Sequence, residues 1–144
     1  MSAALFSIRP QFVQAILKGE KKFEFRTKVC KRKLTTMFIY ATKPIGMIVG
    51  EVNIETVISE NPEELWKLTH DGAGISKSEF DQYFRGREKA YAYKLKNPIF
   101  YNEAMILEDF GIKRAPQSYC YIEDRIQTKN VRPPNLNRTP SSKQ

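Results

Sequence analysis

The chain has 144 residues, of which 41% are hydrophobic and 28% charged, so it has the length of one ordinary domain and can bury a core. Its 24 Lys and Arg residues outnumber its 16 Asp and Glu residues, and the net charge of +8 favours a polyanionic partner, with nucleic acid ahead of an anionic membrane. Two cysteines and one histidine are too few for a four-coordinate zinc site or a disulfide scaffold, and no apolar run is long enough to span a bilayer.

The first part of the sequence alternates between strand and helix patterns. The apolar run at residues 3–8 predicts a buried strand, and Pro10 opens a helix with one apolar face that ends at Gly19. Residues 22–26 alternate strictly between charged and aromatic side chains, which is the period-two pattern of a half-buried strand. Residues 35–42 are β-branched and aromatic and predict another strand.

Residues 47–59 predict one long strand. By simple alternation one of its faces carries Ile48, Val52, Ile54 and Ile58. The opposite face begins apolar at Val49 and becomes polar at Glu51. Glu51 is therefore either a partly buried carboxylate that needs a cationic partner, such as Lys21 or Arg26, or an edge position where the strand leaves the core.

Two helices are expected after the long strand. Asn61 and Pro62 form a typical helix start, and Ser76 and Glu79 have the spacing of a capping box that opens a second helix, ending near Gly86. The last part of the chain predicts three short strands, at residues 89–96, 99–101 and 118–123. This order of elements predicts an α+β domain with enough strands for a small closed or nearly closed barrel.

The excess positive charge lies toward the two ends of the chain. Residues 1–33 hold nine basic and two acidic residues, a net charge of +7, whereas the ten basic and 14 acidic residues of 34–124 give −4. Residues 125–144 hold five basic residues and no acidic one, with little to bury. We therefore predict a domain at residues 1–125 and a flexible basic tail at residues 126–144. Basic segments on a mildly acidic body favour electrostatic binding of a polyanion.

Residues 19–26, Gly-Glu-Lys-Lys-Phe-Glu-Phe-Arg, carry the side chains best suited to chemistry. Pleating places Lys22, Glu24 and Arg26 on one face of the predicted strand, and Lys21 lies at the junction between helix and strand. Lateral pairing on this face can hold the Arg26 guanidinium rigid for a phosphate or a base edge. The same pattern also fits an exposed strand face whose charges neutralise one another.

This segment follows a helix opened by Ser-Ile-Arg-Pro at residues 7–10, and it resembles the signature G-x-K-x-x-E-x-R of the ASCH domains, members of the PUA-like superfamily. The resemblance covers roughly residues 4–123 and continues at residues 39–42, 50–52, 83–87, 90–92 and 114–118. It implies an α+β fold with a small PUA-like β-barrel of about five to seven strands flanked by helices. Related folds bind nucleic acid in a basic cleft, and some receive a flipped or modified base.

By position, the resemblance and the charge pattern imply one nucleic-acid-binding set. It consists of Ser7, Arg9, Lys21, Lys22, Glu24, Arg26, Tyr40, Thr42 and Gln117, with Glu51 in the same cleft. The main functional prediction is a nucleic-acid-binding module that prefers RNA or single-stranded nucleic acid to duplex DNA. We expect no metal, no organic cofactor and no membrane partner. Because the N-terminus lacks the pattern of a secretory signal, we expect a cytoplasmic protein.

The alternative is a hydrolase. Some small ASCH proteins that this chain resembles are amidohydrolases that act on an acylated cytidine with a Lys, Thr and Glu catalytic set. Lys21 and Glu51 match the Lys and Glu of that set, but Glu24 stands where the Thr nucleophile would be. Other members of the family resemble ribonucleases, so cleavage of an RNA strand is the second form of this alternative.

Overall fold

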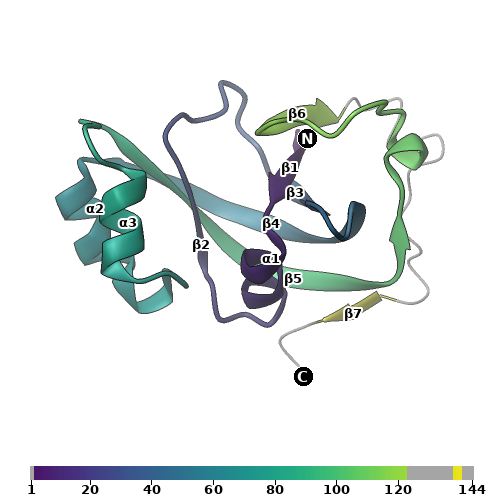
Figure 1. Ribbon diagram of the computed structural model, residues 1–144, viewed down its shortest axis with the longest axis horizontal. Coiled ribbons are helices and arrows are strands. Elements are labelled where there is room, and N and C mark those ends of the chain that lie inside the picture. The colour runs from purple at the N-terminus through teal and green to yellow at the C-terminus, as the bar shows by residue number, and fades with distance from the viewer. Residues whose placement is uncertain (1, 123–137, 141–144) are drawn as a thin grey trace.

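The computed structural model describes residues 2–122 and 138–140. Its helices are α1 (Pro10–Leu17), α2 (Pro62–Thr69) and α3 (Lys77–Tyr83), with 3₁₀ turns η1 (His70–Gly72) and η2 (Leu107–Phe110). Its strands are β1 (Ala3–Ile8), β2 (Phe23–Arg26), β3 (Thr36–Ala41), β4 (Met47–Glu60), β5 (Ala90–Met105), β6 (Tyr119–Ile122) and β7 (Arg138–Pro140). Figure 1 shows α2 and α3 together at one end of the molecule, with α1 near its middle. The prediction of an α+β fold is confirmed.

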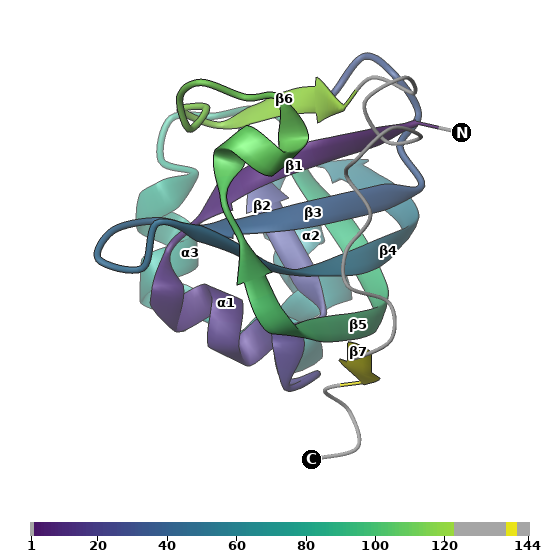
Figure 2. The same ribbon diagram turned by 90° about the vertical axis from the view of Figure 1, so that its right-hand side faces the viewer.

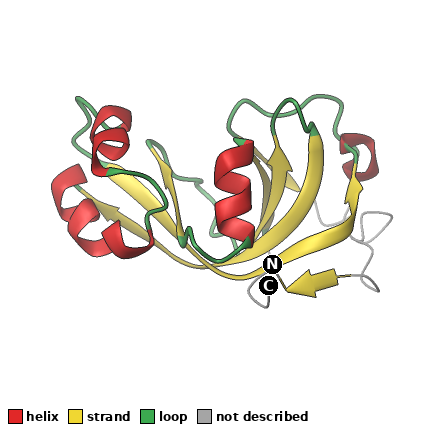
Figure 3. Ribbon diagram, turned by 60° about the horizontal axis from the view of Figure 1, so that its bottom comes forward, coloured by secondary structure: helices red, strands yellow, loops and turns green. Residues whose placement is uncertain are grey.

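The strands form one curved sheet in the order β2-β5-β4-β3-β1-β6, and β7 pairs with β5. β1 and β3 are parallel, whereas the other pairs are antiparallel. Figure 2 shows these strands curling into a half-barrel, and Figure 3 shows α1 standing within the curve of the sheet. The predicted small barrel flanked by helices is confirmed. Because β2 and β6 are the two ends of the strand order, they are the outer edges of this incompletely closed barrel.

Burial of apolar side chains holds the helices on both sides of the sheet. On the inner side, α1 buries Val13 and Ile16 in a core that includes Phe6 of β1. On the outer side, α3 buries Phe80 against Phe25 of β2, with the two ring centroids 5.1 Å apart. Burial of such side chains is the main favourable term in folding. As a result, β2 is packed on one face by the helical pair and faces the barrel with the other.

The predicted alternation along β4 is wrong. Val52 and Ile54 belong to the inner core, but Ile48 lies in a cluster on the opposite face and Ile58 packs under α2 and α3. The cause is a set of register shifts against β5, one of them beside Gly50. A β-bulge adds one residue to one strand of a pair, so every residue beyond it changes face.

The strands predicted on either side of Pro98 are one continuous strand, β5. Pro98 falls at a register shift between β4 and β5, where a ladder hydrogen bond from its nitrogen is not required. Asn97 precedes it with a φ of 54°, a left-handed conformation that asparagine tolerates better than most residues. The pair therefore bends a long strand instead of ending it.

Most of the predicted tail lies outside the described residues. Residues 138–140 form β7, which pairs antiparallel with β5 and places Pro140 opposite Ile99. The division into a domain and a flexible tail at residues 126–144 stays a prediction. In the part of the chain that the structure describes, no helix is both long and apolar enough to cross a membrane.

Candidate nucleic-acid interface

Arg26 and Glu24 form a nearly buried ion pair on the inner face of β2. The Arg26 Nε and Nη2 atoms each lie 3.0 Å from the Glu24 Oε2 atom. The exposed fractions of the two side chains are 13% and 8%, which excludes the exposed, self-neutralising strand face. The lateral pairing expected from the sequence is therefore present. The hydrogen bond that Nε donates to the carboxylate, together with the ion pair of Nη2, fixes the orientation of the guanidinium.

The Arg26 guanidinium also joins the two outer edges of the sheet. Its Nη1 atom donates to the Ser118 hydroxyl at 2.8 Å, and its Nη2 atom donates to the Ser7 carbonyl at 3.1 Å. Ser118 immediately precedes β6, and Ser7 lies in β1, the neighbouring strand. The guanidinium carbon is 4.9 Å from the centre of the Phe6 ring. One side chain from β2 thus spans the opening of the half-barrel that the backbone leaves unpaired.

Ser7 holds the loop before β6 in place. Its hydroxyl donates to the Pro116 carbonyl at 2.6 Å, and its backbone N–H donates to the Ser118 carbonyl at 3.0 Å. Gln117 lies between these two anchored residues and is exposed. The segment 116–118 is therefore a fixed rim beside Arg26, with the Gln117 side chain accessible to solvent.

Lys21 is buried at the junction between α1 and β2, with an exposed fraction of 3%. Its Nζ atom donates to the Ala73 carbonyl at 2.6 Å and lies 5.2 Å and 4.9 Å from the centres of the Phe12 and Phe25 rings. Burial lowers the pKa of the Lys21 ammonium, and the Glu24 carboxylate partly opposes this effect. Lys21 therefore releases its proton more readily than a lysine in water.

The turn that follows α2 packs directly against the side chain of Lys21. Gly74 has a φ of +70°, and a Cβ placed on it would come within 2.6 Å of the Lys21 side chain. Gly72 contacts Lys22 in the same way, and its carbonyl accepts the Lys22 backbone N–H at 2.7 Å. From the sequence, these glycines are expected to form only a turn. The spacing of the glycines does not indicate that they contact Lys21 and Lys22, because these lysines are about fifty residues away along the chain.

Tyr83, at the end of α3, is a residue of this surface that the sequence did not single out. It keeps 46% of its surface exposed, although burial of the hydroxyl raises its pKa, and the charges of Arg26 and Glu24 act on it. Nothing in its local pattern distinguishes Tyr83 from the six other tyrosines. The structure places Tyr83 within electrostatic range of the Arg26–Glu24 ion pair.

The remaining predicted residues are distributed around this centre. Arg9 and Lys22 are exposed, and Arg9 directly precedes α1. Tyr40 is paired with Ser7 across β3 and β1, and Thr42 donates its backbone N–H to the Ile8 carbonyl at 3.0 Å. Both are half-buried. They lie at the strand ends next to Ser7.

Glu51 lies in a different environment from Lys21. Its Oε1 atom accepts the Tyr101 hydroxyl at 2.7 Å, and Tyr101 belongs to the cluster on the opposite face that also contains Ile48. The shift of register at Gly50 explains this position. Lys21 instead contacts Ala73, Phe12 and Phe25, and Arg26 contacts Glu24.

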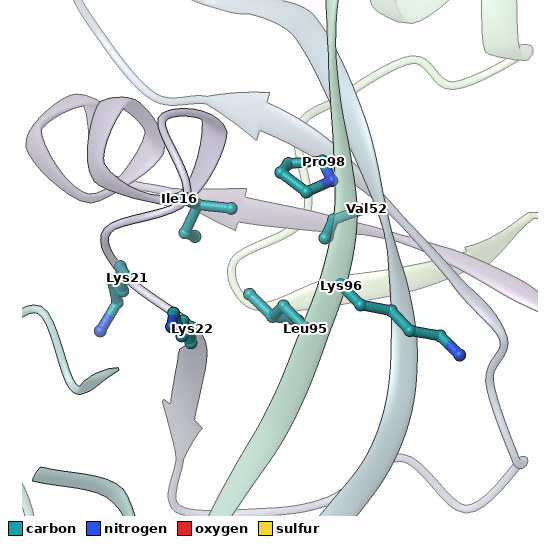
Figure 4. A pocket seen from close by; sticks show the side chains of 8 residues that line it. Ile16, Lys21, Lys22, Val52, Leu95, Lys96 and Pro98 are labelled. Atoms are coloured by element: carbon teal, nitrogen blue, oxygen red, sulfur yellow. The ribbon is translucent and has the colours of Figure 1, made fainter. Parts of the chain in front are cut away.

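A small apolar cavity of about 170 Å³ lies behind the Lys21 backbone. Figure 4 shows the Lys21 side chain extending away from the wall formed by Val52, Leu95 and Pro98. The ammonium of Lys21 is therefore not part of this cavity. Within the described residues there is also no group of three or more His, Cys, Asp or Glu side chains that could hold a metal ion.

Comparison with known proteins identifies the family of this chain. The ASCH domain matches residues 6–99, which is more than half of the chain. The chain belongs to the ASCH family. The matched region includes Lys21, Glu24 and Arg26.

Curated relatives of this ASCH protein share part of their length with it. The ASCH domain-containing ribonuclease of Zymomonas mobilis is 33% identical over 95 residues, which cover 65% of this chain and 64% of that protein. The large ribosomal subunit protein uL22 of Ureaplasma parvum is 26% identical over 120 residues, which cover 83% of this chain and 39% of that protein. This chain therefore matches less than two thirds of either relative.

Solved ASCH structures have the same fold as this chain. The crystal structure of ASCH from Zymomonas mobilis is 29% identical and has a TM-score of 0.79, and the match covers 90% of this chain and 93% of that one. A crystal structure of a point mutant of the same protein is 28% identical and gives a TM-score of 0.80, over 91% of this chain and 97% of that one. The curved sheet with three helices is thus an ASCH fold.

Proposed function

We propose that this ASCH protein binds single-stranded RNA at the surface around Arg26. The observation that carries the proposal is the guanidinium of Arg26, fixed by Glu24, Ser7 and Ser118. A rigid cation at the mouth of a half-barrel is suited to a phosphate or a base edge.

The accessible side chains around Arg26 match the needs of an unpaired strand. Arg9 supplies positive charge for phosphates, and Lys22 supplies it at the opposite end of β2. Gln117 supplies an amide that can both donate and accept at a base edge. Tyr83 offers an exposed ring on which a base can stack. Bases of a duplex are already stacked and paired, so this combination favours a single strand.

The family relatives support RNA as the polymer. One relative is named a ribonuclease and another a ribosomal protein. The net charge of +8 supplies the general attraction to a polyanion, whichever polymer is bound.

The test is a titration of fluorescently labelled single-stranded RNA and duplex DNA of equal length at about 50 and 200 mM salt. We expect tighter binding of the RNA and a steep loss of affinity at the higher salt, because phosphate contacts release counterions. Absence of binding to either polymer at the lower salt would refute the proposal.

A second candidate function is cleavage of the bound RNA. The observation that favours it is Lys21, which is buried between Phe12 and Phe25 and whose pKa is lowered by that burial. A lysine that loses its proton more easily can act as a general base toward a hydroxyl of the RNA. The relative from Zymomonas mobilis is named a ribonuclease.

Hydrolysis of an acylated cytidine has less support from the geometry. Glu24 stands where the hydroxyl nucleophile would be and is engaged with Arg26. Glu51, the second carboxylate of the set, hydrogen-bonds to Tyr101 in a separate cluster.

An assay with end-labelled RNA tests both enzymatic forms, with N4-acetylcytidine assayed in parallel by chromatography. For RNA cleavage we expect Lys21→Gln to remove activity and Glu51→Gln to retain it. Lys67→Gln, on the exposed face of α2, is the matched control for the removal of one positive charge. RNA binding without turnover of either substrate would leave the binding proposal and remove the enzyme.

A further inference from the structure

The loop between β2 and β3 carries the densest positive charge in the described chain. Residues 27–35, which we call the basic loop, contain Lys28, Lys31, Arg32 and Lys33 and no acidic residue, and Lys31, Arg32 and Lys33 follow one another directly at exposed positions. Figures 1 and 2 both show this loop beside β6. Like charges so close together repel one another, so an anionic ligand bound to the loop would reduce this repulsion.

Specific hydrogen bonds hold the basic loop in place. The Cys30 backbone N–H donates to the Tyr93 hydroxyl at 2.9 Å, and the Arg32 backbone N–H donates to the Tyr121 hydroxyl at 3.2 Å. The Arg32 guanidinium lies 4.2 Å from the centre of the Tyr121 ring. Cys30 has a lysine-rich neighbourhood that is typical of a surface position, but its side chain is buried and its backbone anchors the loop. A loop held this way loses less entropy when it binds a ligand than a free loop does.

A hollow of about 470 Å³ lies between the basic loop and β4. Its lining includes the cations Lys31 and Lys33, and also the apolar side chains of Val29 and Val57. Glu55 is the acidic residue of the lining, and Lys94 neutralises it with an ion pair of 3.3 Å. Positive charge combined with apolar side chains suits an anion that has a flat apolar part, which describes a nucleotide.

The hollow and the surface around Arg26 share structural elements. Strand β6 connects the two. Ser118, just before β6, accepts a hydrogen bond from Arg26, and Tyr121, within β6, accepts one from the Arg32 backbone. Phe6 contacts both the Arg26 guanidinium and the ring of Tyr93, at 4.9 Å and 5.3 Å. A strand of nucleic acid that leaves Arg26 along β6 therefore reaches the basic loop.

We propose that the hollow under the basic loop is a second subsite, which takes one nucleotide of the same single-stranded RNA that binds around Arg26. Lys31 and Lys33 contact its phosphates, and the base lies against the accessible apolar side chains of Val29 and Val57. The inference rests on the proposed function.

The test compares three variants in titrations of full-length protein with a labelled single-stranded RNA across salt concentrations. For the double variant Lys31→Gln/Lys33→Gln we expect the salt slope to fall by about 0.7 for each phosphate that the loop no longer neutralises. The matched control is Lys67→Gln/Lys89→Gln, which removes the same charge from exposed positions outside this hollow and is expected to keep the slope. Thr56→Trp fills the hollow without a change of charge, and we expect weaker binding at an unchanged slope.

The outcomes separate this subsite from the proposed function. Equal slopes for the two double variants, in a protein that still binds RNA, would overturn the subsite and leave the proposed function standing. Wild-type affinity in Thr56→Trp would place the phosphates on the loop but exclude a nucleotide from the hollow, which also overturns the proposal. Absence of all RNA binding by the unmodified protein would refute both.

Discussion

Replacement of Arg26 by lysine is expected to destabilise the fold although the charge is kept. In the native protein the planar guanidinium reaches Glu24, Ser7 and Ser118 together. A lysine ammonium is a single point on a flexible stem, so it can stay beside Glu24 but cannot also bridge β1 and the start of β6. The substitution therefore opens the edge-to-edge link of the half-barrel.

The magnitude follows from the hydrogen bonds that lysine cannot make. Two hydrogen bonds from a charged donor, to the Ser7 carbonyl and the Ser118 hydroxyl, are each worth roughly 1–1.5 kcal/mol in this partly buried setting, which gives about 2–3 kcal/mol for Arg26→Lys. Arg26→Ala also leaves the Glu24 carboxylate, 8% exposed, without its cation and is expected to cost about 3–5 kcal/mol.

Urea denaturation monitored by the fluorescence of Trp66 and by circular dichroism measures these changes. Lys77→Met is the control, because it breaks an exposed ion pair with Asp81 and is expected to change the unfolding free energy by less than about 0.5 kcal/mol. The double variant Glu24→Leu/Arg26→Leu is expected to be more stable than Arg26→Ala, since no buried charge is left unpaired. An Arg26→Lys variant as stable as the control would refute the closure of the barrel by Arg26.

Three further outcomes are expected. Because the pKa of Lys21 is lower in the folded protein than in the unfolded chain, the unfolded chain binds this proton more tightly, and the unfolding free energy should rise as the pH increases toward the ordinary lysine pKa of 10.5. In Lys21→Met, measured in the same urea titrations, this rise should be absent. In thermal melts, Gly74→Ala should be more destabilising than Gly86→Ala by roughly 1–3 kcal/mol. Both glycines have positive φ, but only a Cβ at Gly74 would collide with Lys21, so equal destabilisation would contradict this packing. Tyr83→Leu should weaken RNA binding in fluorescence titrations by about five-fold or more. Phe100 has a similarly exposed ring, and Phe100→Leu should not weaken binding; the reverse order would exclude stacking on Tyr83.

Local patterns in the sequence predicted most of the fold. The capping box at Ser76 and Glu79 and the helix start at Asn61 are both present as expected, because they depend on residues three or four apart. The faces of β4 were wrong because a bulge depends on the partner strand, which the alternation of one strand does not reveal.

The same distinction applies to the site. The pairing of Glu24 with Arg26 was predictable, because the two residues are neighbours on one face of β2. The hydrogen bonds of Arg26 to Ser118 and of Lys21 to Ala73 join positions 92 and 52 residues apart and required the folded sheet. The hydrogen bond from Tyr101 to Glu51 likewise joins positions 50 residues apart, and the role of Glu51 in the site stays a prediction.

The most direct test of RNA binding at the half-barrel mouth is a crystal structure of this protein with a short single-stranded RNA. We expect phosphate density beside Arg9 and Arg26, a base stacked on Tyr83, and a hydrogen bond from Gln117 to a base edge. An RNA bound on the exposed faces of α2 and α3, with Arg26 and Tyr83 free of it, would contradict binding at this mouth.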